Sequence, residues 1–594
     1  MIVRMKKLTL VVTQATIQDM LSALRRLGVV HIKNIVKPIA DNINDVEDKL
    51  SQAGQAISVL SECKNKKSTQ SISWTEVEIQ EKIKAVVALF RESLKVQQEI
   101  DHTREQIEFF KPWGGFNPEE ILELSKKEVY ISLYILNKNE LKRIASRTDI
   151  KIINQQKHNS YVVLLSKNPY DKLPFKKISL PEKDFKQIQS RYQMLRHRIG
   201  EIDGILSADV DALTSLKEYA KDLKTSRKFL DVKHGMGIEK SFSYLQGFLP
   251  EDKQAEVASL AATHNAGYII EEPDAMDEVP TCIRNPKWIE IIKPVFSFMN
   301  TVPGYAEYDI SLWFLLFFSL FFAMLIGDAG YGILFLVTTF AVRRKFKKAP
   351  SQPFFLMYIL SFATIVWGAI TGTWFGSEHL AQLPILSSFV IQDISSFAVN
   401  NQNLMIFICF TIGAIQLSIA HLILGFRYFN SLRVLAELGW ISLLWGLYCV
   451  AGMLVIARPF PGFAQYLLIV GTALVLLFSN PQKNILKGIG TSLTNAPLKI
   501  ISTFGDVISY IRLFAVGYAS VVLASTFNDM AASIGFNSII AGLGAALILF
   551  LGHSLNIILG FMAVIVHGVR LNMLEFSGQM NMEWSGKEYA PFKE

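Results

Sequence analysis

The sequence predicts an α-helical polytopic membrane domain and a cytosolic two-lobed α/β domain joined by an antiparallel coiled-coil arm. The 594-residue chain is 50% hydrophobic on average, but residues 1–300 are charged and residues 311–577 are a succession of long apolar runs. In two stretches of the first half, apolar side chains recur at spacings of three and four, which is typical of coiled-coil seams. Shorter β-rich segments border these stretches, as expected for small α/β lobes.

Residues 1–300 are predicted to form the cytosolic arm. Its proximal lobe combines residues 1–36 and 228–300, with strands expected over 3–12, 28–34, 241–250 and 267–271 and a helix over 15–27. The coiled coil is assigned to 43–110 and 184–225, with an interruption at Asp209. The distal lobe occupies 111–183, with strands expected over 128–136 and 160–166.

Residues 301–594 are predicted to form a membrane domain with eight transmembrane helices. These are expected over 311–326, 331–342, 354–374, 404–425, 436–456, 464–478, 498–527 and 539–573. The last two reach ~45 and ~52 Å as helices, against a hydrocarbon layer of ~30 Å. They must therefore tilt or extend beyond the bilayer.

The distribution of basic residues predicts the orientation. Segments 343–348, 427–433 and 483–499 carry the basic residues between spans, whereas Arg458 is the one basic residue in the alternate segments. Because basic loops stay in the cytoplasm, both termini are expected there. A prokaryotic plasma membrane is favoured because long additional loops are absent.

Several function classes are excluded by composition and motif. The net charge of +8 is not arranged as a basic stripe interleaved with aromatic residues, so we expect no nucleic-acid partner. The four cysteines are far apart and form no CxxC pair, and the histidines of the soluble half are scattered singly. No phosphate loop or dinucleotide fingerprint is present. We expect no catalytic centre, cofactor or metal in this chain.

The stretch from Asp506 to Asn528 is almost wholly apolar, yet it contains Arg512. At ~1.5 Å per residue, Arg512 lies roughly 20 Å beyond Lys499, near the middle of a ~30 Å hydrocarbon layer. Arginine keeps its proton, so such a guanidinium must face a water-filled cavity or a carboxylate. One alternative is a packing arginine paired with a fixed carboxylate of the same subunit. We favour ion translocation, because no acidic partner at mid-membrane depth stands out in the chain.

Other polar residues of the membrane half have two interpretations. Arg570 in the eighth span is either functional or a snorkelling interface residue, and Asp328 is first of all a turn former. The remainder are either helix–helix hydrogen bonds or the lining of a water path. These candidate lining residues are Gln416, His421, Ser509, Ser520, Asn556, His567 and Glu575.

Short sequence motifs along nearly the whole chain resemble those of one family, subunit a (subunit I in prokaryotes) of the rotary V-type and A-type ATPases. The motifs are SYIRLFAVG (509–517), HGVRLNMLEF (567–576), GDAGYG (327–332), TGTWFG (371–376), PGYAEYD (303–309), GFLPED (247–252) and GFNPEE (115–120). The two arginines essential in that family match Arg512 and Arg570. Gly560 and Ser520 replace a glutamate and a histidine of eukaryotic relatives, so the residues of the ion paths are not carried over.

The resemblance implies a stator in the membrane sector of an ATP-driven complex. Its half-channels for H⁺ or Na⁺ would end at a rotating proteolipid (c/K) ring, and the arginine pair would force ion release and loading there. The arm would be held by peripheral stalk subunits E and G, near a central-stalk adaptor subunit. Two alternatives are a secondary transporter with a cytosolic regulatory coiled coil, which calls for internal repeats, and a membrane-anchored scaffold, which has no need of Arg512.

Overall fold

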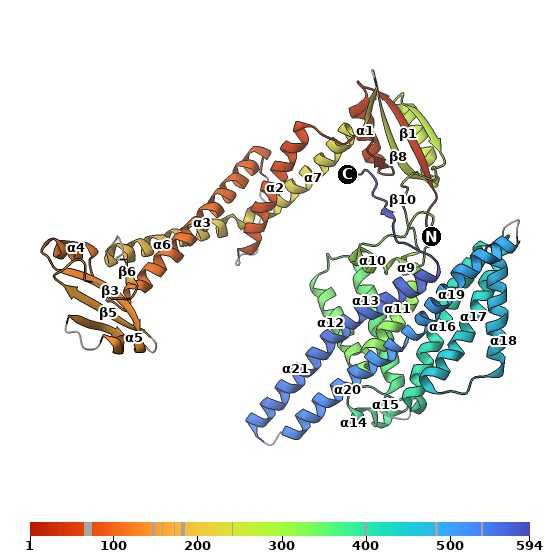
Figure 1. The fold of residues 1–594 in the computed structure, drawn as a ribbon. Helices are drawn as coiled ribbons and strands as arrows, with labels where there is room; N and C mark the ends of the chain where they lie inside the picture. Colours follow the sequence, from red (N-terminus) through yellow and green to blue (C-terminus); the bar gives the residue numbers. More distant parts are fainter. Residues whose placement is uncertain are drawn as a thin grey trace. The chain divides into compact units, whose positions relative to one another are not determined.

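Helices dominate both halves of the chain in the computed structural model (Figure 1). It describes residues 1–63, 74–144, 149–156, 159–171, 173–179, 184–239, 241–396, 401–480, 485–535 and 538–593. Parts of the predicted distal lobe and the start of segment 483–499 lie outside the described residues. One compact unit contains residues 1–10, 24–33 and 246–593, and the other contains 11–23 and 34–245. This division passes through the predicted proximal lobe, and the predicted borders at 36, 228 and 300 stay predictions.

Four long helices of the second unit share one apolar cluster. They are α2 (Asp41–Glu62), α3 (Glu76–Phe110), α6 (Phe185–Ala208) and α7 (Leu213–His234). Their buried side chains, which include Ala53, Val86 and Ile202, are the three- and four-spaced positions of the predicted seams or their neighbours. Ion pairs Glu99–Arg191 (2.6 Å) and Glu92–Arg198 (2.8 Å) follow opposite chain directions, so α3 and α6 are antiparallel. A 3₁₀ turn at Asp209–Ala212 confirms the predicted interruption.

A four-stranded sheet lies beyond these helices in the same unit. Its order is β4-β5-β3-β6, with bounds Ile150–Gln155, Asn159–Ser166, Tyr130–Asn137 and Lys177–Ile178. Strands β3 and β5 were predicted because their inward residues, such as Tyr134, Leu136 and Val162, are apolar and buried. Strand β4 is mostly exposed, which explains why hydrophobic alternation did not reveal it. Helices α4 (Pro118–Lys126) and α5 (Lys138–Arg143) accompany the sheet.

The predicted strands near the two ends of the soluble half form a second sheet. Its order is β2-β8-β1-β9, with β7 beside β8. The bounds are His31–Lys33, Phe242–Pro250, Met5–Thr13, Gly267–Glu271 and Gly237–Glu239, and α1 (Ile17–Leu27) and α8 (Gln254–Thr263) connect strands. Residues 31–33 pair antiparallel with 246–248, so segments more than two hundred positions apart complete one sheet.

The membrane half is a bundle of apolar helices. They are α11 (Ser311–Ile326), α12 (Ala329–Lys345), α13 (Ser351–Thr371), α16 (Gln402–Arg427), α17 (Arg433–Ile456), α18 (Gly462–Phe478), α19 (Ile485–Ser509), α20 (Ile511–Ile534) and α21 (Ile539–Ala563). Over the described residues, five helical segments are long and apolar enough to cross a membrane. They include 496–534, which joins α19 and α20, and 539–579, which contains α21 and the helical turns that follow it. Two more, α11 and α12, form a pair bent by 119°, and α18 has 17 residues. The great length of the last two helices is thereby confirmed, whereas the count of eight spans stays a prediction.

Helix α11 is the centre of this bundle. It is apolar around its whole circumference, as expected for a helix surrounded by others, and Phe314, Phe321 and Phe322 are fully buried. Helices α13, α20 and α21 all pack against it. In Figure 1, α20 and α21 lie side by side and run obliquely past the α16–α18 group. The aromatic core therefore holds the two long helices on one side of the bundle.

A buried carboxylate fixes the bend between α11 and α12. The side chain of Asp328 is 2% exposed and accepts four backbone N–H groups, from Gly330, Tyr331, Phe375 and Gly376, at 2.7 to 3.3 Å. Two of the motifs that carry the family resemblance, 327–332 and 371–376, are therefore joined through the Asp328 side chain. Asp328 is a turn former, as predicted, but the turn is buried rather than exposed between spans.

The C-terminal strap, residues 585–593, binds back onto the N-terminal sheet region. Strand β11 (Lys587–Glu588) pairs parallel with β10 (Pro280–Thr281). The Ala590 N–H donates to His31 Nδ1 at 3.1 Å, and the Phe592 N–H donates to the Val30 carbonyl at 2.8 Å. The strap thus ties the last membrane helix to the segment that precedes the first one.

Asp328→Ala is expected to destabilise the membrane domain. It leaves four buried N–H groups without an acceptor, and each such group costs about 1–3 kcal/mol. Thermal unfolding of the purified protein in detergent measures the effect as a lower Tm. The matched variant Asp328→Asn keeps one oxygen and should lose less. Equal Tm values for the wild type and Asp328→Ala would contradict this role.

Docking of the C-terminal strap is expected to weaken below neutral pH. Burial lowers the pKa of His31, so the undocked state binds a proton more readily. Docking is therefore complete above the ordinary value of about 6.5 and is lost as the pH falls below it. Hydrogen-exchange protection factors for 587–592, corrected for the intrinsic rate, measure this. His31→Gln keeps an acceptor but does not titrate, so its protection should not depend on pH; a dependence equal to wild type would refute the account.

Candidate functional site

Arg512 lies in the first turn of α20, just after a break in the helix. Helix α19 ends at Ser509, and the Leu513 N–H bonds to the Tyr510 carbonyl, a shorter link than the α-helical one. Arg512 Nε turns back and donates to the Ser509 carbonyl at 3.1 Å. The break therefore orients the guanidinium along the end of α19 rather than outward into an apolar layer.

The two arginines converge on one carboxylate oxygen. Arg512 Nη2 donates to Glu575 Oε1 at 2.7 Å, and Arg570 Nε lies 3.7 Å from the same atom. The Glu575 side chain is 4% exposed, against 23% for Arg512 and 54% for Arg570. The carboxylate is thus enclosed by the protein, while both guanidinium groups keep an accessible side. This Arg512–Glu575–Arg570 cluster is the candidate site.

An unusual helical winding brings Arg570 and Glu575 together. In an α-helix, residues five apart point about 140° away from each other. Here the chain is π-helical over Val564–Gly568 and Leu571–Phe576, and bonds from i to i+5 align residues five apart. Local π-winding is frequent at functional sites. It places both side chains on the face that meets Arg512.

The expectation that Arg512 has no acidic partner in its own chain is wrong. Glu575 was predicted as a candidate lining residue, not as the partner of Arg512. The alternative of a carboxylate of the same subunit is therefore the observed arrangement. Among the described residues this neutralisation is incomplete, since two guanidinium groups share one carboxylate, and one positive charge remains. The next carboxylate, Asp506, binds Gln579 Nε2 at 2.6 Å and forms no ion pair with either arginine.

A buried polar network separates the site from the rest of the bundle. Tyr510, fully buried, donates from its hydroxyl to Gln416 Oε1 at 2.7 Å, and Gln416 Nε2 donates to Asn572 Oδ1 at 2.9 Å. Gly413 makes room for the tyrosine, because a Cβ there would lie 2.6 Å from its ring. Gln416 is therefore part of a packed, hydrogen-bonded wall between α16, the break before α20 and the π-helical segment Leu571–Phe576.

The other candidate lining residues lie in separate places. His421 is buried, contacts Glu437 Oε2 through Nδ1 at 2.7 Å and stacks on Trp440. Ser520 donates to Asn556 Oδ1 at 3.0 Å. The Asn556 amide donates to Tyr331, whose hydroxyl also meets His553. The buried Nδ1 of His567 has no partner among the described residues, and the carbonyl of Ser509 accepts from Arg512. The structure brings Glu575, Ser509 and the two arginines together but not the remaining candidates.

A polar cavity of about 510 Å³ opens at one end of α16 to α19. Its walls include Arg427, Glu437 and Lys499. Residues 306–308, which precede the membrane helices in the sequence, and residues 580–582, which follow them, also line it. Lys499 lies over the Trp440 ring at 4.9 Å. Glu437 connects the cavity to the buried His421. The cavity is thus lined by charged side chains and lies at the end of the bundle that carries the C-terminal strap.

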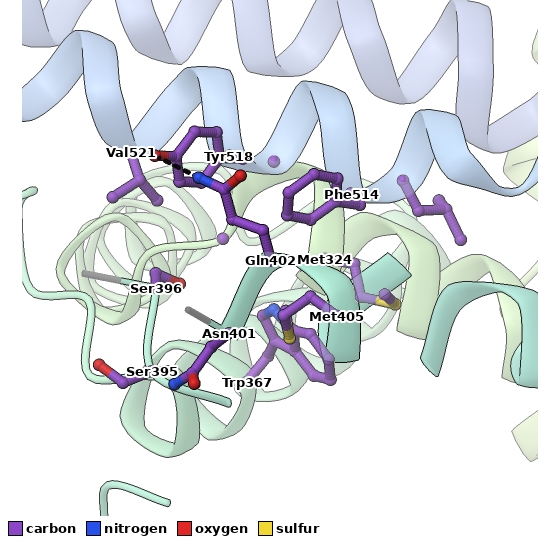
Figure 2. A pocket seen from close by; sticks show the side chains of 13 residues that line it. Met324, Trp367, Ser395, Ser396, Asn401, Gln402, Met405, Phe514, Tyr518 and Val521 are labelled. Carbon is purple, nitrogen blue, oxygen red and sulfur yellow. Dashed lines mark hydrogen bonds between the residues drawn. The ribbon is translucent and has the colours of Figure 1, made fainter. Parts of the chain in front are cut away.

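A second, smaller cavity lies at the opposite end of α16 (Figure 2). Its volume is about 30 Å³, room for one or two water molecules. The walls are Met324, Gly327, Trp367, Ser395, Ser396, Asn401, Gln402, Met405, Leu513, Phe514, Gly517, Tyr518 and Val521. Figure 2 shows the 3.0 Å hydrogen bond from Gln402 to the Tyr518 hydroxyl across one side. The cavity ends beside Leu513, the neighbour of Arg512.

Neither cavity has one of the seven candidate lining residues in its described walls. The sequence analysis did not single out three of the wall residues, Glu437, Lys499 and Tyr518. The first two are charged residues near the ends of apolar spans, and the third is an aromatic residue within one, and such residues are common in membrane helices. Glu437 alone offered a signal, as a carboxylate in the second turn of α17. Over the described residues, no group of three or more His, Cys, Asp or Glu side chains is placed to hold a metal ion.

Three known proteins are similar to this chain over nearly its whole length. V-type ATP synthase subunit I of Borreliella burgdorferi is 33% identical, over 100% of this chain and 99% of that protein. V-type ATP synthase subunit I 1 of Treponema pallidum is 31% identical over the whole of both chains. A-type ATP synthase subunit I of Methanocaldococcus jannaschii is 24% identical, over 100% and 98%.

No family model matches the sequence. A crystal structure of the cytoplasmic N-terminal domain of subunit I, homolog of subunit a, of V-ATPase covers 45% of this chain and 99% of that chain. Its sequence identity is 15% and its TM-score is 0.23, so the relation of this chain to known proteins depends on the sequence matches.

Proposed function

The chain belongs to the family of V-type and A-type ATP synthase I subunits, and from that premise we propose that it is the stator against which a proteolipid ring turns. The Arg512–Glu575–Arg570 cluster is the observation that carries the proposal. Two guanidinium groups with one carboxylate leave an excess positive charge on the accessible side of α20 and α21. Such a charge in a membrane requires a partner carboxylate.

The ring supplies that partner. A ring carboxylate loaded with H⁺ or Na⁺ is neutral and can face lipid. When it reaches the cluster, it gives up its ion and pairs with Arg512, because attraction is strong in a low dielectric and offsets the cost of a bare carboxylate. The presence of Glu575 changes the mechanism predicted from the sequence, because Arg512 is already paired before the ring carboxylate arrives. The ring carboxylate then interacts with the excess positive charge of the Arg512–Glu575–Arg570 cluster.

The two cavities are the proposed half-channels. Residues 402–405 and 424–427 of α16 border different cavities and lie about 33 Å apart along the helix. Between them lie Gln416, Tyr510 and the arginines, and neither cavity has these residues in its described walls. Ions would therefore reach the ring from either face but not pass straight through, and the positive charge reinforces that block.

Chain connectivity favours the predicted eight spans. The strap contacts Val29, His31 and Thr281. The segments before the first span and after the last therefore lie on one side of the membrane, which requires an even number of crossings. Among the described residues, the five long helices and α18 make six. The bent pair of α11 and α12 then counts as two, giving eight with both termini in the cytoplasm of a prokaryotic plasma membrane.

The soluble half is the proposed anchor for the peripheral stalks. Its antiparallel helices α3 and α6 form the arm of the predicted coiled coil, with a lobe at the far end. Stalk subunits E and G and a central-stalk adaptor are the proposed partners. A secondary transporter with a regulatory arm is the weaker alternative, because the excess charge of the cluster faces outward rather than toward a central substrate site.

Arg512→Ala is expected to abolish coupled transport while the complex still assembles. The variant removes the charge that holds the ring carboxylate, and a loss of about a hundredfold or more is expected. ATP-driven ion uptake into vesicles by purified complex measures it, with subunit composition as the assembly check. Uptake at the wild-type rate would overturn the proposed function.

Arg512→Lys is also expected to fail. An ammonium lacks the planar fork that reaches Ser509 and Glu575 together, and it can lose its proton when buried. The same vesicle assay tests this, with uptake below about a tenth of wild type expected. A lysine variant that pumps normally would show that a point charge suffices.

The half-channels are expected to open to opposite sides. In a cysteine-free background, Ser479→Cys on the larger cavity should react with a membrane-impermeant thiol reagent from the cytoplasmic side, and Gln402→Cys on the smaller from the other side. Ser418→Cys, buried between them, is the control and should react from neither. Labelling of both cavity positions from one side would exclude this path.

A further inference from the structure

We propose that Glu575 is a resident counter-ion that alternates with the ring carboxylate as the partner of Arg512. The proposal rests on the proposed function and adds a positioning residue to it. Between encounters Glu575 holds both arginines, and during an encounter it releases Arg512 and keeps Arg570. The stator then never presents two bare guanidinium groups to the membrane.

The geometry differs from that of a permanent structural salt bridge. Strong arginine–carboxylate pairs are often bidentate, with both carboxylate oxygens accepting. Here both arginines meet Oε1, and the buried Oε2 has no hydrogen-bond partner among the described residues. Glu575 therefore uses half of its accepting capacity, and a carboxylate held this way exchanges partners easily.

Arg512 has donors left for a second carboxylate. Of its five N–H groups, hydrogen bonds in the described structure use two, at Nε and Nη2. The Arg512 side chain is 23% exposed, whereas the carboxylate side chain that it binds is 4% exposed. An incoming carboxylate can therefore approach on the accessible side while Glu575 still occupies the other.

Arg570 is suited to retain Glu575 during the exchange. Its 3.7 Å separation is an ion pair rather than a short hydrogen bond, and it can shorten when Arg512 turns to the ring. The exchange passes hydrogen bonds from Glu575 Oε1 to the ring carboxylate and back. The ring carboxylate first loses its H⁺ or Na⁺ to the adjoining half-channel. The exchange of partners that follows breaks no covalent bond and moves no proton, so the charges of the ring carboxylate, Glu575 and the two arginines stay the same during it.

The test measures how transport depends on the concentration of the transported cation, H⁺ or Na⁺, in vesicles containing the assembled complex. Glu575→Gln raises the excess charge of the cluster from one to two. The ring carboxylate is then held more firmly as an anion, so reloading needs more cation. The concentration for half-maximal transport is expected to rise about tenfold, with a smaller change in the maximal rate.

Two further variants make the test specific. Glu583→Gln is the same substitution at an exposed carboxylate eight residues later and should match wild type. Glu575→Asp keeps the charge and should stay within about threefold of wild type. A Glu575→Gln complex with the wild-type concentration dependence would overturn the proposal. Arg512→Ala, measured in the same assay, distinguishes failure of this proposal from failure of the proposed function. Normal transport by Arg512→Ala would overturn the proposed function, whatever the result for Glu575→Gln.

A structure of the assembled wild-type complex tests the exchange without any substitution. In the state where a ring carboxylate meets Arg512, Glu575 is expected to lie beyond hydrogen-bond distance of Arg512 and close to Arg570. A Glu575 that keeps its 2.7 Å contact with Arg512 in every rotational state would overturn the proposal.

Discussion

The structure of the membrane half depends on how charge is held inside an apolar bundle. Two guanidinium groups cannot lose their protons, and one buried carboxylate offsets only one of them. Full neutralisation would have made a stable but inert salt bridge. No compensation would have made the helices too costly to insert. The observed arrangement lies between these extremes, and the remaining charge is what a moving carboxylate can use.

The rest of the bundle keeps this cluster in position. The buried aromatic side chains of helix α11, Phe314, Phe321 and Phe322, support α20 and α21. Asp328 fixes the bend that follows α11 through four backbone N–H groups. π-winding turns Glu575 toward Arg570, and the break at Tyr510 turns Arg512 toward Glu575. The C-terminal strap ties the end of the same helix to the N-terminal sheet. Several independent contacts thus hold the site in position.

Much of the fold followed from periodicity and composition. The strands β1, β3, β5, β8 and β9 and the long helices of the arm were predicted because their apolar residues alternate or recur at helical spacing. Exposed β4 carries no such pattern. Helices α11 and α12 were expected from their apolar runs over 311–326 and 331–342, but the 119° bend between them was not. At the site, apolar surroundings singled out Arg512, but its partner was missed. The partner was missed for a physical reason. In an α-helix residues 570 and 575 point in different directions, and no local sequence pattern predicts the π-helix that brings them together.

The central claim is that the accessible side of α20, next to Arg512, faces the ring. Cysteine cross-linking from α20 to the residue beside the ring carboxylate tests it most directly in the assembled complex. Ala515, Ala519 and Val522 are exposed on α20, whereas Leu513 and Gly517 are buried against this chain. The account predicts cross-links from the three exposed positions and none from the two buried ones. Cross-links that are absent from the exposed positions, while the complex is intact and pumping, would contradict it.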